Sequence, residues 1–255
     1  MRYWVPFTPA EALPRLERAM ETFAAALATG ELGAPVPTCP GWDLRALGDH
    51  LGNVHRWARG AIVEGHPQTP EIASPSGQQD LVDWYRESAG LLLDTLRGVD
   101  PGQECWTFGP KPRTAAFWFR RQLHETTMHG QDAGLAAGGP AAALDLPVAL
   151  DGVHEVAGLF FPRQVRLHRI EPLARALAVV PSDPDPAAEG LRWVLAGDGT
   201  GPACAADAPA DVEVTGPADV LLDLLWHRAA PDDPRLSVTG DRGALDAVLG
   251  VALTS

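Results

Sequence analysis

Residues 43–57 read DLRALGDHLGNVHRW, and the apolar side chains of this stretch recur at helical spacing. Leu47, Leu51 and Val54 form a stripe of the kind that a bundle helix buries. His50 falls on the same stripe, so its imidazole is expected to face the interior of a helical bundle.

A second helical stretch, residues 119–133, reads FRRQLHETTMHGQDA. Glu125 and His129 lie four residues apart in it and therefore share one helix face. If His50 meets them inside a bundle, two imidazoles and a carboxylate form a transition-metal site with a fourth position open. The spacing also fits a purely structural interpretation without a metal. His50 would then be an ordinary core residue, and Glu125 and His129 would form a surface pair that contributes about 0.2–0.5 kcal/mol to helix stability.

Other side chains near these ligands could support such a site. Arg121 precedes Glu125 by four residues, and we expect the two to pair. Asp132 follows His129 by three residues, where it could orient the imidazole, cap the helix end or face solvent. Cys39, just before Pro40-Gly41-Trp42, lies near a helix start that would favour a thiolate, but a small buried apolar residue is the expectation.

The order of predicted elements indicates an α+β, mainly helical fold. Apolar periodicity predicts four helices in the first part of the chain, which modest loops would arrange as a four-helix bundle: Pro9–Thr29, Asp43–Glu64, Gln79–Leu96 and Thr114–Ala136. A fifth helix near Val148–Phe161 is expected to pack on the bundle.

The pattern changes near residues 162–172, so we expect a bundle domain over residues 1–165 and a small α+β domain over residues 170–255. The second domain should contain four strands and two helices: Ala176–Val180, Leu191–Leu195, Val212–Thr215, Pro217–Arg228, Arg235–Thr239 and Asp241–Leu249.

Arg228 continues the apolar stripe of the helix predicted for Pro217–Arg228. Its guanidinium could grip a carboxylate-bearing ligand with two hydrogen bonds. The alternative is that a cation in the last turn merely complements the helix dipole.

Composition excludes several classes of protein. The 255 residues carry a formal net charge of −13, so binding to nucleic acid is not expected. No uncharged apolar run is long enough for a membrane span, and the first residues lack the apolar segment of a signal peptide. Three cysteines without CxxC spacing favour neither a disulfide framework nor a structural zinc cluster, which fits a cytoplasmic protein.

Two segments, VPTCPGWDLRALGDHLGNVHRWA (36–58) and RRQLHETTMHGQDA (120–133), resemble the mycothiol-dependent maleylpyruvate isomerase family of actinobacteria. A third, LLDLLWHRAAPDDPRLSVTGD (221–241), resembles the family's C-terminal signature, with Arg228 at its Trp-x-Arg position. The resemblance covers nearly the whole chain. It implies a DinB-like metal-binding four-helix bundle followed by a small α+β domain.

The resemblance also implies a function. His50, Glu125 and His129 would bind a divalent metal, with Zn²⁺ expected, and mycothiol would be the thiol cofactor. The expected enzyme isomerises a small-molecule substrate by thiolate addition, with Arg228 holding a substrate carboxylate. Residues that bind the rest of the cofactor, and the oligomeric state, are not predicted.

Several alternatives stay open at this stage. They are a mycothiol S-transferase acting on another electrophile, a hydrolase that uses metal-bound water, and a metal-binding or scaffold protein without catalysis. The chain also departs from the family, whose fourth helix reads His-Arg-Trp-Asp where this chain has His129-Gly130-Gln131-Asp132. Because this chain lacks the bulk and the charge of the family's Arg-Trp pair, the identity of its substrate stays open.

Overall fold

The computed structural model describes residues 4–68 and 70–254. These residues form two compact units, one made of residues 7–143 and one made of the N-terminal residues up to 6 together with residues from 144 onward. No helix of the described residues is long and apolar enough to cross a membrane.

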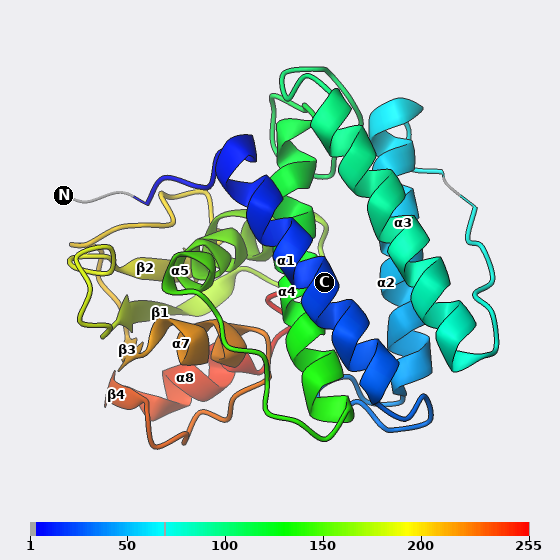
Figure 1. The fold of residues 1–255 in the computed structure, drawn as a ribbon. Helices are drawn as coiled ribbons and strands as arrows, with labels where there is room; N and C mark the ends of the chain where they lie inside the picture. The colour runs from blue at the N-terminus through cyan, green and yellow to red at the C-terminus, as the bar shows by residue number, and fades with distance from the viewer. Residues whose placement is uncertain (1–3, 69, 255) are drawn as a thin grey trace. The chain divides into compact units, whose positions relative to one another are not determined.

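The first unit is a bundle of four helices of similar length, coloured blue to green in Figure 1. They are α1 (Pro9–Thr29), α2 (Leu44–Val63), α3 (Gln78–Gly98) and α4 (Ala116–Ala136). Helices α1 and α2 each pack against both α3 and α4. This arrangement confirms the bundle that the apolar periodicity predicts, and the bounds of α1 agree with the prediction at both ends.

Local sequence signals explain where the bundle helices begin. The Thr8 side chain accepts a hydrogen bond from the Glu11 amide, and the Glu11 carboxylate accepts one from the Thr8 amide, a capping box. Asp43 caps α2 by accepting from the amide of Ala46 at 2.8 Å. The fourth helix begins two residues later than predicted, because Thr114 pairs with Glu104 in an isolated bridge and α4 starts at Ala116.

The bundle core is made of leucines and aromatic rings that are almost completely buried. Its largest fully buried side chains include Trp118, Tyr85 and Phe23. Gly52 allows α2 to approach α3 closely, because a Cβ atom there would lie 2.1 Å from Cζ3 of Trp84. Any larger residue at position 52 would therefore push these two helices apart.

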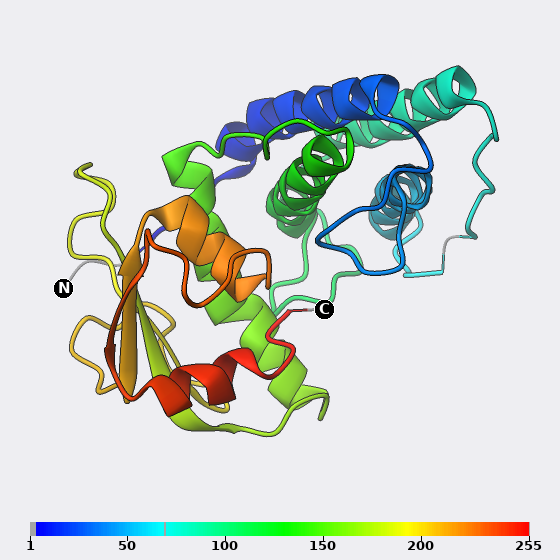
Figure 2. The same ribbon diagram turned by 90° about the horizontal axis from the view of Figure 1, so that it is seen from below.

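The second unit contains a four-stranded sheet with the strand order β2-β1-β3-β4. The strands are β1 (Leu173–Pro181), β2 (Trp193–Gly197), β3 (Val212–Gly216) and β4 (Ser237–Gly240). Strand β1 runs parallel to β3, and the two outer strands are antiparallel to their neighbours. Helices α7 (Ala218–Leu225) and α8 (Arg242–Leu249) both pack against β1 and β3 (Figure 2). The predicted α+β character of this part is thereby confirmed.

The units divide at a different place from the predicted boundary between residues 165 and 170. Helix α5 (Leu146–Glu155), the short π-helix η1 (Val156–Phe160) and α6 (Phe161–Arg166) belong to the second unit. The physical reason is the packing of α5 on α7, which is so close that a Cβ atom on Gly152 would lie 2.7 Å from Cδ2 of Leu222. The apolar face of the fifth helix is thus buried within the second unit.

Helix α7 ends earlier than the sequence pattern predicts. Its last helical residue is Leu225, and His227 adopts a positive φ of 57°, a conformation that ends a helix. Arg228 therefore follows the helix rather than continuing its apolar stripe, and the prediction that it lies in the last helical turn is wrong.

Candidate metal centre

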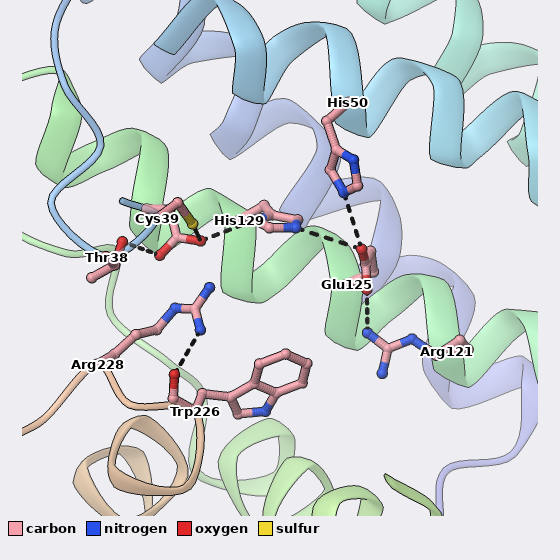
Figure 3. A network of polar contacts seen from close by, with 9 residues as sticks. Thr38, Cys39, His50, Arg121, Glu125, His129, Trp226 and Arg228 are labelled. Carbon is pink, nitrogen blue, oxygen red and sulfur yellow. Dashed lines mark hydrogen bonds and ion pairs between the residues drawn. The ribbon is translucent and has the colours of Figure 1, made fainter. Parts of the chain in front are cut away.

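Helices α2 and α4 bring together the three side chains that the sequence singles out as ligands. The Nε2 atom of His50 lies 3.6 Å from Oε1 of Glu125, and Nε2 of His129 lies 3.5 Å from the same oxygen (Figure 3). One ligand atom from each residue lies within 4.8 Å of the other two. The i,i+4 spacing on α4 and the packing of α2 on α4 together produce this cluster.

The spacing of these atoms suits a shared cation. Both nitrogen–oxygen distances exceed the 2.7–3.2 Å of ordinary N–H···O hydrogen bonds. Ligand atoms held about 2.1 Å from a tetrahedral ion would lie roughly 3.4 Å from one another. The observed separations, 3.5 and 3.6 Å, are close to that value, so the donor set fits a divalent metal.

Arg121 fixes the charge and direction of Glu125. Its guanidinium donates to Oε2 of Glu125 at 2.6 Å, and its side chain is only 3% exposed. Burial by itself would raise the pKa of Glu125, but the Arg121 charge and the contacts with His129 and His50 hold it well below its usual range. Glu125 is therefore ionised, with Oε1 turned towards the two imidazoles.

Asp132 orients the second imidazole. The Nδ1–H group of His129 donates to Oδ2 of Asp132 at 2.9 Å, which leaves Nε2 on the side of Glu125. The Thr38 hydroxyl donates to the other oxygen of Asp132 at 2.6 Å, and the Cys39 thiol lies 3.6 Å from Oδ2. Although burial opposes the protonated form, Asp132, Cys39 and Glu125 raise the pKa of His129 well above its usual value.

The loop between α1 and α2, residues 30–43, supplies residues that the sequence pattern does not assign to the site. Backbone hydrogen bonds between Val36, Cys39 and Trp42 fold the loop tightly, so that its side chains are held in place. Cys39 is partly buried and packs against the hydrophobic core of the bundle, as expected of a small apolar residue, while its thiol also faces the Asp132 carboxylate. The Trp42 ring contacts His50 edge-on at 4.8 Å and stacks over His129 at 6.4 Å between ring centroids.

His55, five residues after His50, lies apart from the cluster. It is completely buried, and its ring nitrogens contact Oε1 of Gln122 at 2.8 Å and the Tyr85 hydroxyl at 3.4 Å. Burial lowers the pKa of His55 from 6.5 to about 4, so it is neutral at physiological pH. Its role is that of a hydrogen-bonded core residue.

Arg228 belongs to the second unit, where its guanidinium contacts Trp226. It donates to the Trp226 carbonyl oxygen at 3.1 Å and lies 5.4 Å from the centroid of the indole ring (Figure 3). The side chain is half-buried.

Position 130, next to His129, is a small residue on a buried face of α4. A Cβ atom built on Gly130 would have no neighbouring atom within 4 Å. Position 130 therefore has space for the first atom of the side chain that the family's His-Arg-Trp-Asp pattern places there.

Comparison with known proteins places these features in a family. Residues 13–134 match the mycothiol maleylpyruvate isomerase N-terminal domain, and residues 147–247 match the C-terminal domain of the same family. No protein of curated function matches the sequence.

Two solved structures share the fold. A crystal structure of mycothiol-dependent maleylpyruvate isomerase superposes with a TM-score of 0.59 at 14% identity, covering 94% of this chain and 96% of that chain. A histidine-to-alanine mutant of the mycothiol-dependent maleylpyruvate isomerase gives a TM-score of 0.57 with the same identity and coverage.

Proposed function

Because the chain belongs to the mycothiol maleylpyruvate isomerase family, we propose that it is a metal- and mycothiol-dependent enzyme that isomerises a small cis-configured unsaturated acid. The observation that supports the metal most strongly is the arrangement of His50, Glu125 and His129 around one point. A cytoplasmic location is part of the proposal, since low-molecular-weight thiols are kept reduced there.

The three residues would hold the ion through two imidazole nitrogens and one carboxylate oxygen, a set that suits Zn²⁺ and leaves one position open. A divalent metal in this position supplies positive charge that lowers the pKa of a thiol sulfur. Arg121 keeps Glu125 ionised, and Asp132 keeps His129 in the tautomer that presents Nε2. Both supporting contacts are with side chains that have almost no solvent exposure.

The chemistry proposed for the thiol is reversible addition. When bound, the thiol would supply a nucleophilic sulfur that adds to the substrate's conjugated double bond and leaves again once the resulting single bond has rotated, so that the trans isomer forms and the thiol is returned unchanged. Arg228 is proposed to hold a substrate carboxylate through its guanidinium.

A second candidate is a mycothiol S-transferase, in which the same thiolate displaces a leaving group from another electrophile. The exchange of the family's Arg-Trp pair for Gly130-Gln131 favours this alternative, because the lost bulk and charge next to His129 suit a substrate different from the family's usual one.

The proposal can be tested through the metal and the thiol together. Protein loaded with Co²⁺ should develop a sulfur-to-metal charge-transfer band when mycothiol is added, and no band with S-blocked mycothiol. Cys39, Cys105 and Cys204 are replaced by Ser to exclude their own sulfur atoms. His50→Ala should bind less metal than the wild type, whereas His66→Ala, a change of an exposed histidine, should not.

The outcomes separate the competing functions. Turnover without a band would indicate activated water and a hydrolase. Neither a band nor turnover across cis-unsaturated acids and other electrophiles would support a scaffold protein. Equal metal content in the wild type and His50→Ala would overturn the ligand assignment.

A further inference from the structure

Cys39 lies beside the metal cluster and belongs to a second group of potential ligands (Figure 3). In the part of the chain that the structure describes, one ligand atom each from Cys39, His129 and Asp132 lies within 4.8 Å of the other two. We call this group the second position, and the group of His50, Glu125 and His129 the first position. The two positions share only His129, whose Nε2 atom faces the first and whose Nδ1 atom faces the second.

The thiol and the carboxylate of the second position are each held by separate bonds. The Cys39 amide donates to the Val36 carbonyl at 3.1 Å, and the Cys39 carbonyl accepts from the Trp42 amide at 3.0 Å. The Thr38 hydroxyl donates to Oδ1 of Asp132 at 2.6 Å, and the Asp132 side chain has no exposed surface. Ligands fixed in this way lose little conformational freedom when an ion binds.

The sulfur–oxygen distance is that of two ligands on one tetrahedral ion. The Sγ atom of Cys39 lies 3.6 Å from Oδ2 of Asp132. A sulfur about 2.3 Å and an oxygen about 2.1 Å from a tetrahedral ion would lie roughly 3.6 Å apart. The Nδ1 atom of His129 lies 2.9 Å from the same oxygen, at hydrogen-bond distance. An ion there replaces the Nδ1 proton, and the nitrogen and oxygen move apart by about 0.5 Å.

Occupation of the second position changes what His129 offers to the first. An ion bound to Nδ1 leaves the neutral imidazole with its proton on Nε2, which lies 3.5 Å from Oε1 of Glu125. The Cys39 thiol releases its proton to water as the sulfur binds. With a proton on it, Nε2 is no longer a ligand, so an ion in the second position excludes an ion from the first.

The two positions also differ in the ions that they suit. The second contains sulfur, and thiolate ligands select thiophilic ions such as Zn²⁺, Cu⁺ and Cd²⁺. The first consists of two imidazoles and a carboxylate, which also accept harder ions such as Mn²⁺. The chemistry of the ion therefore decides which side of the His129 ring it occupies.

We propose that Cys39, His129 and Asp132 form a second, sulfur-containing site for a thiophilic divalent ion, and that an ion there withdraws His129 from the first position. Thiophilic ions then compete with the metal of the first position and displace it. The inference goes beyond the proposed catalysis, because the ion binds without mycothiol or substrate. Cys39 and His50 separate the two positions experimentally, since each belongs to one group only.

The test is titration of the metal-free protein with Cd²⁺, followed by the sulfur-to-metal charge-transfer absorption and by the metal content after dialysis. The wild type should develop the band and retain a single ion per chain. His50→Ala should keep the band, because it removes a ligand of the first position only. Cys39→Ala should lose the band and bind Cd²⁺ at least about 10-fold more weakly. Cys105→Ala, a change of another partly buried cysteine, should match the wild type.

Mn²⁺ is the second probe, because it favours oxygen and nitrogen ligands over sulfur. Its affinity, measured by competition with a chelator, should fall in His50→Ala and be the same in Cys39→Ala as in the wild type. Bound Mn²⁺ should leave the wild type as the Cd²⁺ band appears. Circular dichroism checks the fold, and Cys39→Ser, which is close to cysteine in size, takes the place of Cys39→Ala should the alanine variant be unfolded.

Loss of the band in folded His50→Ala protein would make Cys39 a ligand of the first position and overturn the inference. A band that persists without the Cys39 sulfur would overturn it as well, as would binding of Cd²⁺ to the wild type without a band. Retention of Mn²⁺ and Cd²⁺ together on one chain would disprove the exclusion through His129.

Discussion

The Nδ1 atom of His129 lies 2.9 Å from Oδ2 of Asp132, and the Asp132 side chain has no solvent-exposed surface. A buried carboxylate in this position sets both the tautomer and the orientation of the imidazole. The Thr38 hydroxyl, bonded to the other carboxylate oxygen, holds Asp132 in turn. The geometry of the candidate metal centre therefore depends on residues outside the set of three proposed ligands.

Asp132→Asn should weaken metal binding by about 10- to 100-fold, the usual effect of losing a carboxylate that orients a ligating histidine. Competition with a chelator of known affinity measures this change. Thr38→Val removes the supporting hydroxyl but keeps the carboxylate, so its effect should be smaller. Unaltered affinity in Asp132→Asn would mean that His129 needs no such orientation.

The buried imidazole of His55 should make stability depend on pH. Because burial lowers its pKa from 6.5 to about 4, the unfolded chain binds more protons than the folded protein between these two values. The free energy of unfolding should therefore fall by about 3 kcal/mol, from this residue, as the pH drops through that window.

His55→Gln should remove this contribution, because the amide does not titrate. Urea denaturation of metal-free wild type and variant at a series of pH values gives the comparison, and the difference between their stabilities should shrink as the pH falls from 6.5 to 4. A constant difference over this range would contradict the assignment of a lowered pKa to His55.

Gly130→Ala should stabilise the bundle by about 0.5–1 kcal/mol, since glycine is unfavourable inside a helix and an added Cβ atom meets open space. Thermal unfolding of the metal-free protein measures the gain. Gly52→Ala is the matched contrast on α2, because its Cβ atom would collide with the Trp84 ring. Destabilisation by Gly130→Ala would show that the space beside His129 is needed for packing.

Arg228→Ala should reduce kcat/KM for a carboxylate-bearing substrate by roughly 10- to 100-fold, because hydrogen bonds to a charged group contribute about 1.5–3 kcal/mol. Metal content and melting temperature should change little. Arg235→Ala, an exposed arginine paired with Asp233, serves as the control. A lower melting temperature with unchanged kcat/KM would assign Arg228 a structural role through Trp226 instead.

Local sequence patterns predict the helices well but not every end. The helix Pro9–Thr29 was found with its predicted bounds, since its capping box and apolar stripe are both local features. The end of α7 is predicted too late. The positive φ at His227 ends the helix, and because this residue is not glycine, the sequence gives no signal for that conformation. The fifth helix is predicted to pack on the bundle, but its apolar face packs on α7 instead. Apolar periodicity shows that a helix has a buried face, and it does not show which element covers that face.

The sequence by itself determined that Glu125 and His129 share a helix face, because the helical repeat is a property of the chain, and that His50 lies on the buried stripe of another helix. Only the tertiary structure decided that these side chains meet. Their encounter depends on how α2 and α4 pack and rotate against each other, which is set by side chains along both helices. The bonds from Asn53 and Asp49 on α2 to the loop that precedes α3 likewise depend on how the chain turns back on the helix, and no pattern along the chain prescribes that pairing.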